Sequence, residues 1–180
     1  MSIGTKVYTD LMIDIETLGI CADCVIAQIG AVPFNATENG PQILFNISIE
    51  SCCDLGLKTD ASTILFWIKQ SDTAIESVFF SRPRIHVKDA LNQIQRVSET
   101  VERIWSHATY DFVCINTALR KFTTAQMDFR KARDIRTLTD LAGINPSDFK
   151  SIGTAHNALD DCLFQISYCR EAMKKLGYWK

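Results

Sequence analysis

Two acidic residues separated by a single residue, Asp14 and Glu16, lie near the end of an apolar run. The run is the segment LMIDIET over residues 11–17. The run predicts a β-strand, and because side chains alternate along a strand, both acids point to the same face. Two carboxylates on one face repel each other, and hard divalent cations such as Mg²⁺ or Mn²⁺ make that arrangement favourable. The pair therefore suggests a metal site. An ordinary strand with Ile13 and Ile15 in the core and both acids in water is the alternative.

Three further residues with suitable chemistry follow later in the chain: Asp111, His156 and Asp161. Each of them also has an ordinary structural explanation. Asp111 could cap the helix that follows it, and His156 could be a loop histidine packed against the last helix. Asp161 could favour the first turns of that helix through the helix dipole. Taken one at a time, these residues do not decide between structure and chemistry.

Their order along the chain is more informative. Asp-x-Glu on the first strand, a later Asp, and then His-x-Ala-x-x-Asp over residues 156–161 resemble the DnaQ-like exonucleases of the DEDDh group, which use four acids and a histidine. The motif spacing selects Asp161 over Asp160. Within this group the chain resembles the phage-type exonucleases and the Rv2179c-like exoribonucleases at three further segments, residues 63–71, 104–105 and 133–138. The resemblance covers roughly residues 9–172. One departure is that relatives often carry Asn or Gly at His107 and Phe at Tyr110.

The resemblance implies a metal-dependent 3'-to-5' exonuclease that releases nucleoside 5'-monophosphates, with two Mg²⁺ or Mn²⁺ ions per active site. In the roles that the family assigns, Asp14 bridges both ions. Glu16 and Asp161 complete the site of the ion that activates water, and Asp111 supports the other ion. His156 is the expected general base, because an imidazole with the ordinary pKa of about 6.5 can accept a proton near neutral pH.

The resemblance also indicates substrate contacts at Thr17, Leu18 and Trp67. Leu18 matches a family position that lies against the terminal nucleotide, and a core leucine is the alternative. Phe66 and Trp67 match an aromatic pair that could stack bases, although at least one of the two should be core. We expect the substrate to be the 3' end of single-stranded DNA, because the chain resembles the phage-type exonucleases more closely than the Rv2179c-like exoribonucleases. The alternatives are an exoribonuclease of the Rv2179c-like type and, in another class, a catalytically idle nucleic-acid-binding module.

Composition sets wider limits. At 180 residues and 47% hydrophobic content, the chain predicts one exonuclease domain over residues 1–180. A net charge of -2 argues against a protein that coats long nucleic acid. The seven cysteines lack zinc-type spacing and are expected to be reduced thiols. No run approaches a membrane span, so we expect no membrane partner and a cytoplasmic location in a bacterial cell or phage-infected host. The relatives are compatible with a homodimer.

Hydrophobic periodicity predicts the elements that must position these residues. Three strands near residues 7–15, 25–34 and 42–49 should form an antiparallel meander. Helices are expected over residues 61–69, 72–80 and 87–97, after Asp111, and from His156 to Gly177, with a short strand at residues 103–105. A small helix capped by Asp134 should end near Gly143. The resemblance implies an α/β fold of the RNase H-like type. Its mixed five-stranded sheet has three antiparallel strands, then two parallel ones, and is flanked by helices.

Overall fold

A mixed sheet forms the centre of the computed structural model, which describes residues 8–151 and 153–179. In sheet order its strands are β4 (Arg84–Ile85), β3 (Ile43–Ile47), β2 (Ile26–Phe34), β1 (Asp10–Thr17), β5 (Arg103–Ser106) and β6 (Ala132–Asp134). β1, β2 and β3 pair antiparallel, and β5 and β6 continue the sheet parallel to β1. This confirms three antiparallel strands followed by two parallel ones. Residue 7 of the first predicted strand lies outside the described residues.

The expected strand count is wrong by one, because β4 adds a sixth strand parallel to β3. A two-residue strand is too short to show a hydrophobic period. The strand expected over residues 42–49 ends early, since the Ser48 hydroxyl accepts a hydrogen bond from the Ser51 amide and caps α1 (Ile49–Asp54). The helix expected over residues 72–80 is divided into α3 (Asp72–Ile75) and the π-helical η1 (Glu76–Phe80).

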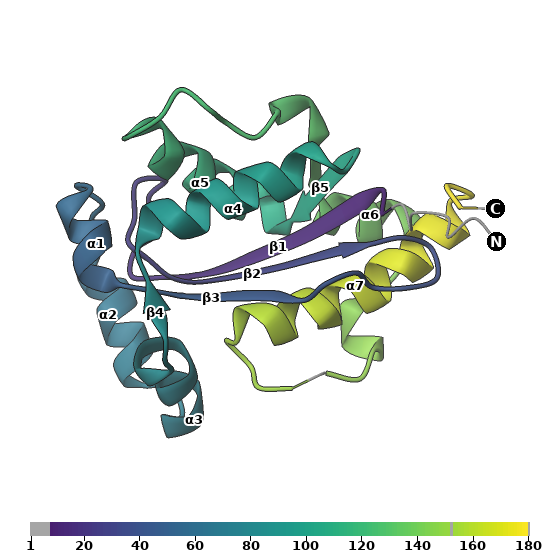
Figure 1. Cartoon of the computed structure of the whole chain (residues 1–180). Coiled ribbons are helices and arrows are strands. Elements are labelled where there is room, and N and C mark those ends of the chain that lie inside the picture. The colour runs from purple at the N-terminus through teal and green to yellow at the C-terminus, as the bar shows by residue number, and fades with distance from the viewer. Residues whose placement is uncertain (1–7, 152, 180) are drawn as a thin grey trace, which may run out of the picture.

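Helices cover both faces of the sheet (Figure 1). The longer ones are α2 (Ala61–Ile68), α4 (Val87–Glu99), α5 (Tyr110–Arg120), α6 (Ile135–Ala142) and α7 (Ala158–Lys175). Short 3-10 turns lie at η2 (His107–Thr109), η3 (Phe129–Lys131) and η4 (Pro146–Asp148). Asp134 caps α6 and Gly143 ends it, as expected. Within the part of the chain that the structure describes, no helix is both long and apolar enough to cross a membrane.

Strand β1 contributes to a hydrophobic cluster on each face of the sheet. Leu11, Ile13 and Ile15 belong to the cluster that includes residues of α4 and α5. Met12 belongs to the cluster that includes residues of α6 and α7. Because side chains alternate along the strand, the even-numbered positions that follow Met12 face α7. The register of β1 therefore presents Asp14 and Glu16 to the last helix.

The first turn of α7 lies directly against β2. Gly30 makes this approach possible, since a Cβ at this position would lie 2.2 Å from the carbonyl oxygen of Ala158. Gln28, two residues earlier on the strand, accepts a hydrogen bond from the Ala158 amide at 2.9 Å. Asn157 caps the helix and also donates to the Ser77 hydroxyl of η1 at 2.7 Å. These contacts fix the start of α7 relative to the sheet.

We predict that Gly30→Ala destabilises the protein more than an ordinary Gly→Ala change. The new methyl group would meet backbone atoms of Ala158 and Leu159 in the first turn of α7, which cannot move aside like a flexible side chain, so the free energy of unfolding should fall by about 3 kcal/mol. Gly177→Ala is the matched control. Gly177 has φ 73° and no neighbour within 4 Å, so only backbone strain of about 1 kcal/mol is expected there. Urea unfolding measures both, and equal losses would contradict a close contact at Gly30.

Candidate active site

Three acids from two elements meet beside the start of α7. Asp14 and Glu16 come from β1, and Asp161 comes from the first turn of α7. Each offers one ligand oxygen, and the three oxygens lie within 4.8 Å of one another. In the described part of the chain, no lysine or arginine forms an ion pair with any of these acids. Among the residues described, therefore, no lysine or arginine offsets the negative charge that these acids carry when they are ionised.

Asp111 lies next to this cluster, outside the set of three oxygens. It is 4% exposed, and its Oδ1 accepts a hydrogen bond from the Ile15 amide at 3.0 Å. This contact is possible because β5 pairs with β1 only as far as Met12, which leaves the end of β1 open to α5. The capping alternative is wrong, since Thr109 occupies the N-cap of α5 and Asp111 lies inside the first turn. The side chain of Asp111 is thus held against β1, the strand that carries Asp14 and Glu16.

Burial and mutual repulsion shift the acids in the same direction. Burial, followed by the charges of the other three acids, holds the pKa of Asp14 well above its usual value. Burial and the charges of Asp161 and Asp111 raise the pKa of Glu16 to about 8. Burial raises the pKa of Asp111 to about 7 and that of Asp161 to about 6, where the charge of His156 acts in the opposite direction. A bound cation would reverse these shifts, because it favours the ionised forms.

The loop before α7 places His156 beside Asp161. His156 has a left-handed backbone with φ 62°. Asp160 holds the loop closed by accepting a hydrogen bond from the Thr154 amide at 2.8 Å. The imidazole packs edge-on against Phe66 and Trp67 of α2, with ring centroids 5.4 and 5.8 Å away. Asp160 is thus structural, and the oxygen that joins the acid cluster belongs to Asp161, as the motif spacing predicts.

Of the three expected substrate contacts, Thr17 ends β1, Leu18 directly follows it, and Trp67 lies on α2 and is largely buried. Trp67 is only 5% exposed, and its Nε1 donates to the Thr17 carbonyl at 2.8 Å, so it fastens α2 to β1 and leaves little surface for a base. Its neighbour Phe66 is 44% exposed and lines a cavity of about 560 Å³ together with Thr17. Leu18 is half-buried and packs against the cluster of Ala27, Trp67 and Val78, which favours a core role for much of its side chain.

Comparison with known proteins supplies the family. The family described as the 3'-5' exoribonuclease Rv2179c-like domain matches residues 9–173. This chain belongs to the Rv2179c-like family. The fold is also similar to that of Exonuclease X in complex with 5' overhanging duplex DNA, with a TM-score of 0.51 and 14% identity over 96% of this chain and 95% of that chain. The resemblance to DnaQ-like 3'-5' exonucleases and the RNase H-like fold are therefore confirmed. No curated protein matches the chain.

The site of this Rv2179c-like domain also contains a residue that the motif does not include. Gln165 of α7 is buried and donates a hydrogen bond from Nε2 to Asp14 Oδ1 at 2.7 Å. It follows Asp161 by four residues, so helical spacing places both on one face of α7. That spacing was the available signal, but a lone glutamine on a helix carries no chemistry that sequence reasoning would select.

The donor set of the Rv2179c-like domain fits a divalent cation. Carboxylate oxygens are the ligands that Mg²⁺ and Mn²⁺ prefer. Three of them converge from β1 and α7, and their repulsion has no counter-charge from lysine or arginine among the residues described. Buried like charges are costly unless they are paired or coordinate a metal.

We predict that the metal-free protein loses stability as the pH rises. Glu16 titrates near 4.5 when unfolded and near 8 when folded, so its favourable contribution is complete below about pH 4.5 and is lost as the pH approaches 8. Glu16→Gln removes this contribution. Between pH 5 and 8, the free energy of unfolding of the wild type should fall by roughly 3 kcal/mol more than that of the variant.

Urea unfolding in the presence of a chelator measures this difference. Glu171→Gln, an exposed position on the same helix as Asp161, is the matched control and should follow the wild type. Parallel pH curves for Glu16→Gln and the wild type would contradict the raised pKa of Glu16.

Proposed function

We propose that this Rv2179c-like domain is a metal-dependent 3'-to-5' exonuclease that hydrolyses the terminal phosphodiester bond and releases nucleoside 5'-monophosphates. The convergence of three carboxylate oxygens within 4.8 Å is the observation that carries the proposal. A buried acidic cluster of this kind is stable in its ionised form when cations occupy it. The family assignment supports the same reaction class.

The proposed mechanism assigns a separate task to each group. Asp14, Glu16, Asp111 and Asp161 would hold two Mg²⁺ or Mn²⁺ ions, which when bound neutralise phosphate charge and activate water for attack. Asp111 is kept in place by the Ile15 amide, so its carboxylate does not have to reorganise when substrate binds. His156 accepts the proton of the attacking water as general base.

The rings around His156 restrict its movement. Phe66 and Trp67 contact the imidazole edge-on, and Trp67 is itself fastened to β1 through the Thr17 carbonyl. The base is therefore connected to the strand that carries Asp14 and Glu16. In this proposal the exposed ring of Phe66 and the cavity that it shares with Thr17 receive the 3'-terminal nucleotide.

RNA is the first candidate polymer, because the family that covers residues 9–173 is described as an exoribonuclease domain. DNA, which the phage-type resemblance favours, is the second candidate. The similar Exonuclease X structure contains a DNA duplex with a 5' overhang, which supports a DNA end as a substrate that this fold can accommodate. A catalytically idle binding module is less well supported, since a binding function would not require the buried acids to converge.

Matched single-stranded RNA and DNA, each labelled at the 5' end, test the reaction and the polymer together. With Mn²⁺ or Mg²⁺ we expect stepwise shortening from the 3' end, faster on RNA, and none with a chelator. A substrate blocked at its 3' end should resist. Cutting of the blocked substrate would indicate an endonuclease. Binding without shortening of either polymer would indicate the idle module.

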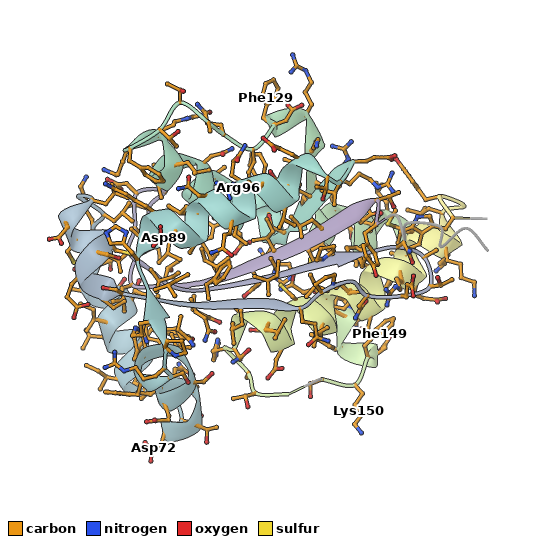
Figure 2. The ribbon with its side chains drawn as sticks, viewed as in Figure 1. Asp72, Asp89, Arg96, Phe129, Phe149 and Lys150 are labelled. Atoms are coloured by element: carbon orange, nitrogen blue, oxygen red, sulfur yellow. The ribbon has the colours of Figure 1, made fainter. Side chains whose placement is uncertain are left out.

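We predict that His156→Ala lowers the rate by roughly 10²–10⁴-fold, the usual effect of losing a general base. Asp14→Asn should abolish metal-dependent shortening, since it removes one of the carboxylates that would hold the ions. Asp89→Asn is the matched control, because Asp89 is exposed on α4, on the opposite side of the sheet from α7 (Figure 2). Initial rates on the preferred polymer, with circular dichroism as a check on folding, measure these effects. An active, folded Asp14→Asn protein would contradict the mechanism.

A further inference from the structure

A glutamine side chain contacts the acid cluster from α7. Gln165 is 3% exposed, and its Nε2 donates to Asp14 Oδ1 at 2.7 Å. Its Oε1 is also buried, yet it has no hydrogen-bond partner in the described part of the chain. Nearly all buried polar atoms in proteins are paired, and an exception commonly marks the place of a water molecule or an ion. The unpaired oxygen is on the side chain that already orients Asp14.

The orientation of the amide suits a metal-bound Asp14. With a cation bound, the Asp14 carboxylate is ionised and only accepts hydrogen bonds, so the NH₂ group of Gln165 faces Asp14, as observed, and Oε1 points elsewhere. The hydroxyl of Tyr168, three residues further along α7, does not pair with this oxygen and instead forms a 3.1 Å contact with His107 Nε2. The protein thus holds the amide by one end and leaves a buried acceptor at the other.

We propose that Gln165 is a positioning residue for the metal site. Its Nε2 fixes the rotation of the Asp14 carboxylate, and its Oε1 accepts a hydrogen bond from a water molecule in the hydration shell of a bound divalent cation. This inference rests on the metal-dependent function proposed above.

A neutral amide suits this task better than a charged group. Lysine or arginine in place of Gln165 would orient Asp14 but would also cancel the negative charge that attracts the cation. An additional carboxylate would add to the repulsion among the acids. The glutamine amide orients the carboxylate and leaves its charge intact. Partners of this kind, which hold a ligand without touching the metal, commonly change metal affinity or activity by about 10–100-fold when they are replaced.

The test uses the full-length protein with Gln165→Met, which keeps an unbranched side chain of similar length but forms neither hydrogen bond. Melting temperature is followed as Mn²⁺ is added. The Mn²⁺ concentration that gives half of the shift should rise by about 10–100-fold in the variant. At saturating Mn²⁺ the exonuclease rate should recover towards that of the wild type, which a general folding defect would not produce.

Gln95→Met is the matched control. Gln95 also donates from Nε2 to a carboxylate, that of Glu99, at 2.7 Å, but this pair is exposed on α4. Its Mn²⁺ titration should match the wild type. If Gln165→Met also matches the wild type while the wild type responds to Mn²⁺, the positioning role is wrong and the metal site remains. If the wild type itself shows no response to Mn²⁺, the proposed function fails and this inference fails with it.

A second measurement tests the positioning role of Gln165 if Gln165→Met does not fold. In the wild type, the NMR signals of the Gln165 side-chain amide should move when Mg²⁺ is added, and those of Gln95 should stay in place. Stationary Gln165 signals, combined with a moving backbone amide at Asp14, would show that the cation binds without involving the glutamine and would overturn the proposal.

Discussion

The meeting of four carboxylates at one end of β1, two of them buried and two half-buried, is the constraint on which the rest of the structure depends. Burial and mutual repulsion raise the pKa values of these acids, which are Asp14, Glu16, Asp111 and Asp161. Among the residues described, no lysine or arginine forms an ion pair with any of them. Holding them together costs free energy, which packing elsewhere must offset. The hydrophobic clusters on the two faces of the sheet supply that packing, and β1 belongs to both. The strand that carries two of the acids is therefore held by both clusters.

Left-handed backbone conformations adjoin the site where α5 and α7 begin. Ala108 and Thr109, with φ 47° and 57°, directly precede α5, and His156 precedes α7. This conformation is unfavourable for residues with a Cβ, so neighbouring contacts must maintain it. Asp134 does this before α5, because its Oδ1 accepts a hydrogen bond from the Ala108 amide at 2.7 Å while it also caps α6. The cap expected from the sequence thus stabilises two elements at once, one of which carries Asp111.

Local patterns in the sequence located the acids because their signals are local. Period-two alternation predicts Asp14 and Glu16 on one face of a strand, and the motif spacing selects Asp161 over Asp160. Such local patterns do not indicate which distant segments of the chain contact each other. The apolar composition of α2 does not show that Trp67 is the residue buried on it, since four other residues of the helix are large and hydrophobic: Ile64, Leu65, Phe66 and Ile68. The hydrogen bond from Gln165 to Asp14 joins residues 151 positions apart, and the motif contains no glutamine to indicate it.

In the proposed mechanism the acids act on phosphate, which DNA and RNA share, so a preference between the two polymers must arise elsewhere. The cavity next to the site is lined by several hydroxyl-bearing side chains, among them Thr17 and Tyr110. Both of these hydroxyls already donate to the carbonyl of Gly19, at 2.8 and 2.9 Å. Each therefore retains acceptor lone pairs but no free proton. A nucleotide in this cavity could use these oxygens only by donating a hydrogen bond, and the 2'-hydroxyl is a donor that RNA has and DNA lacks.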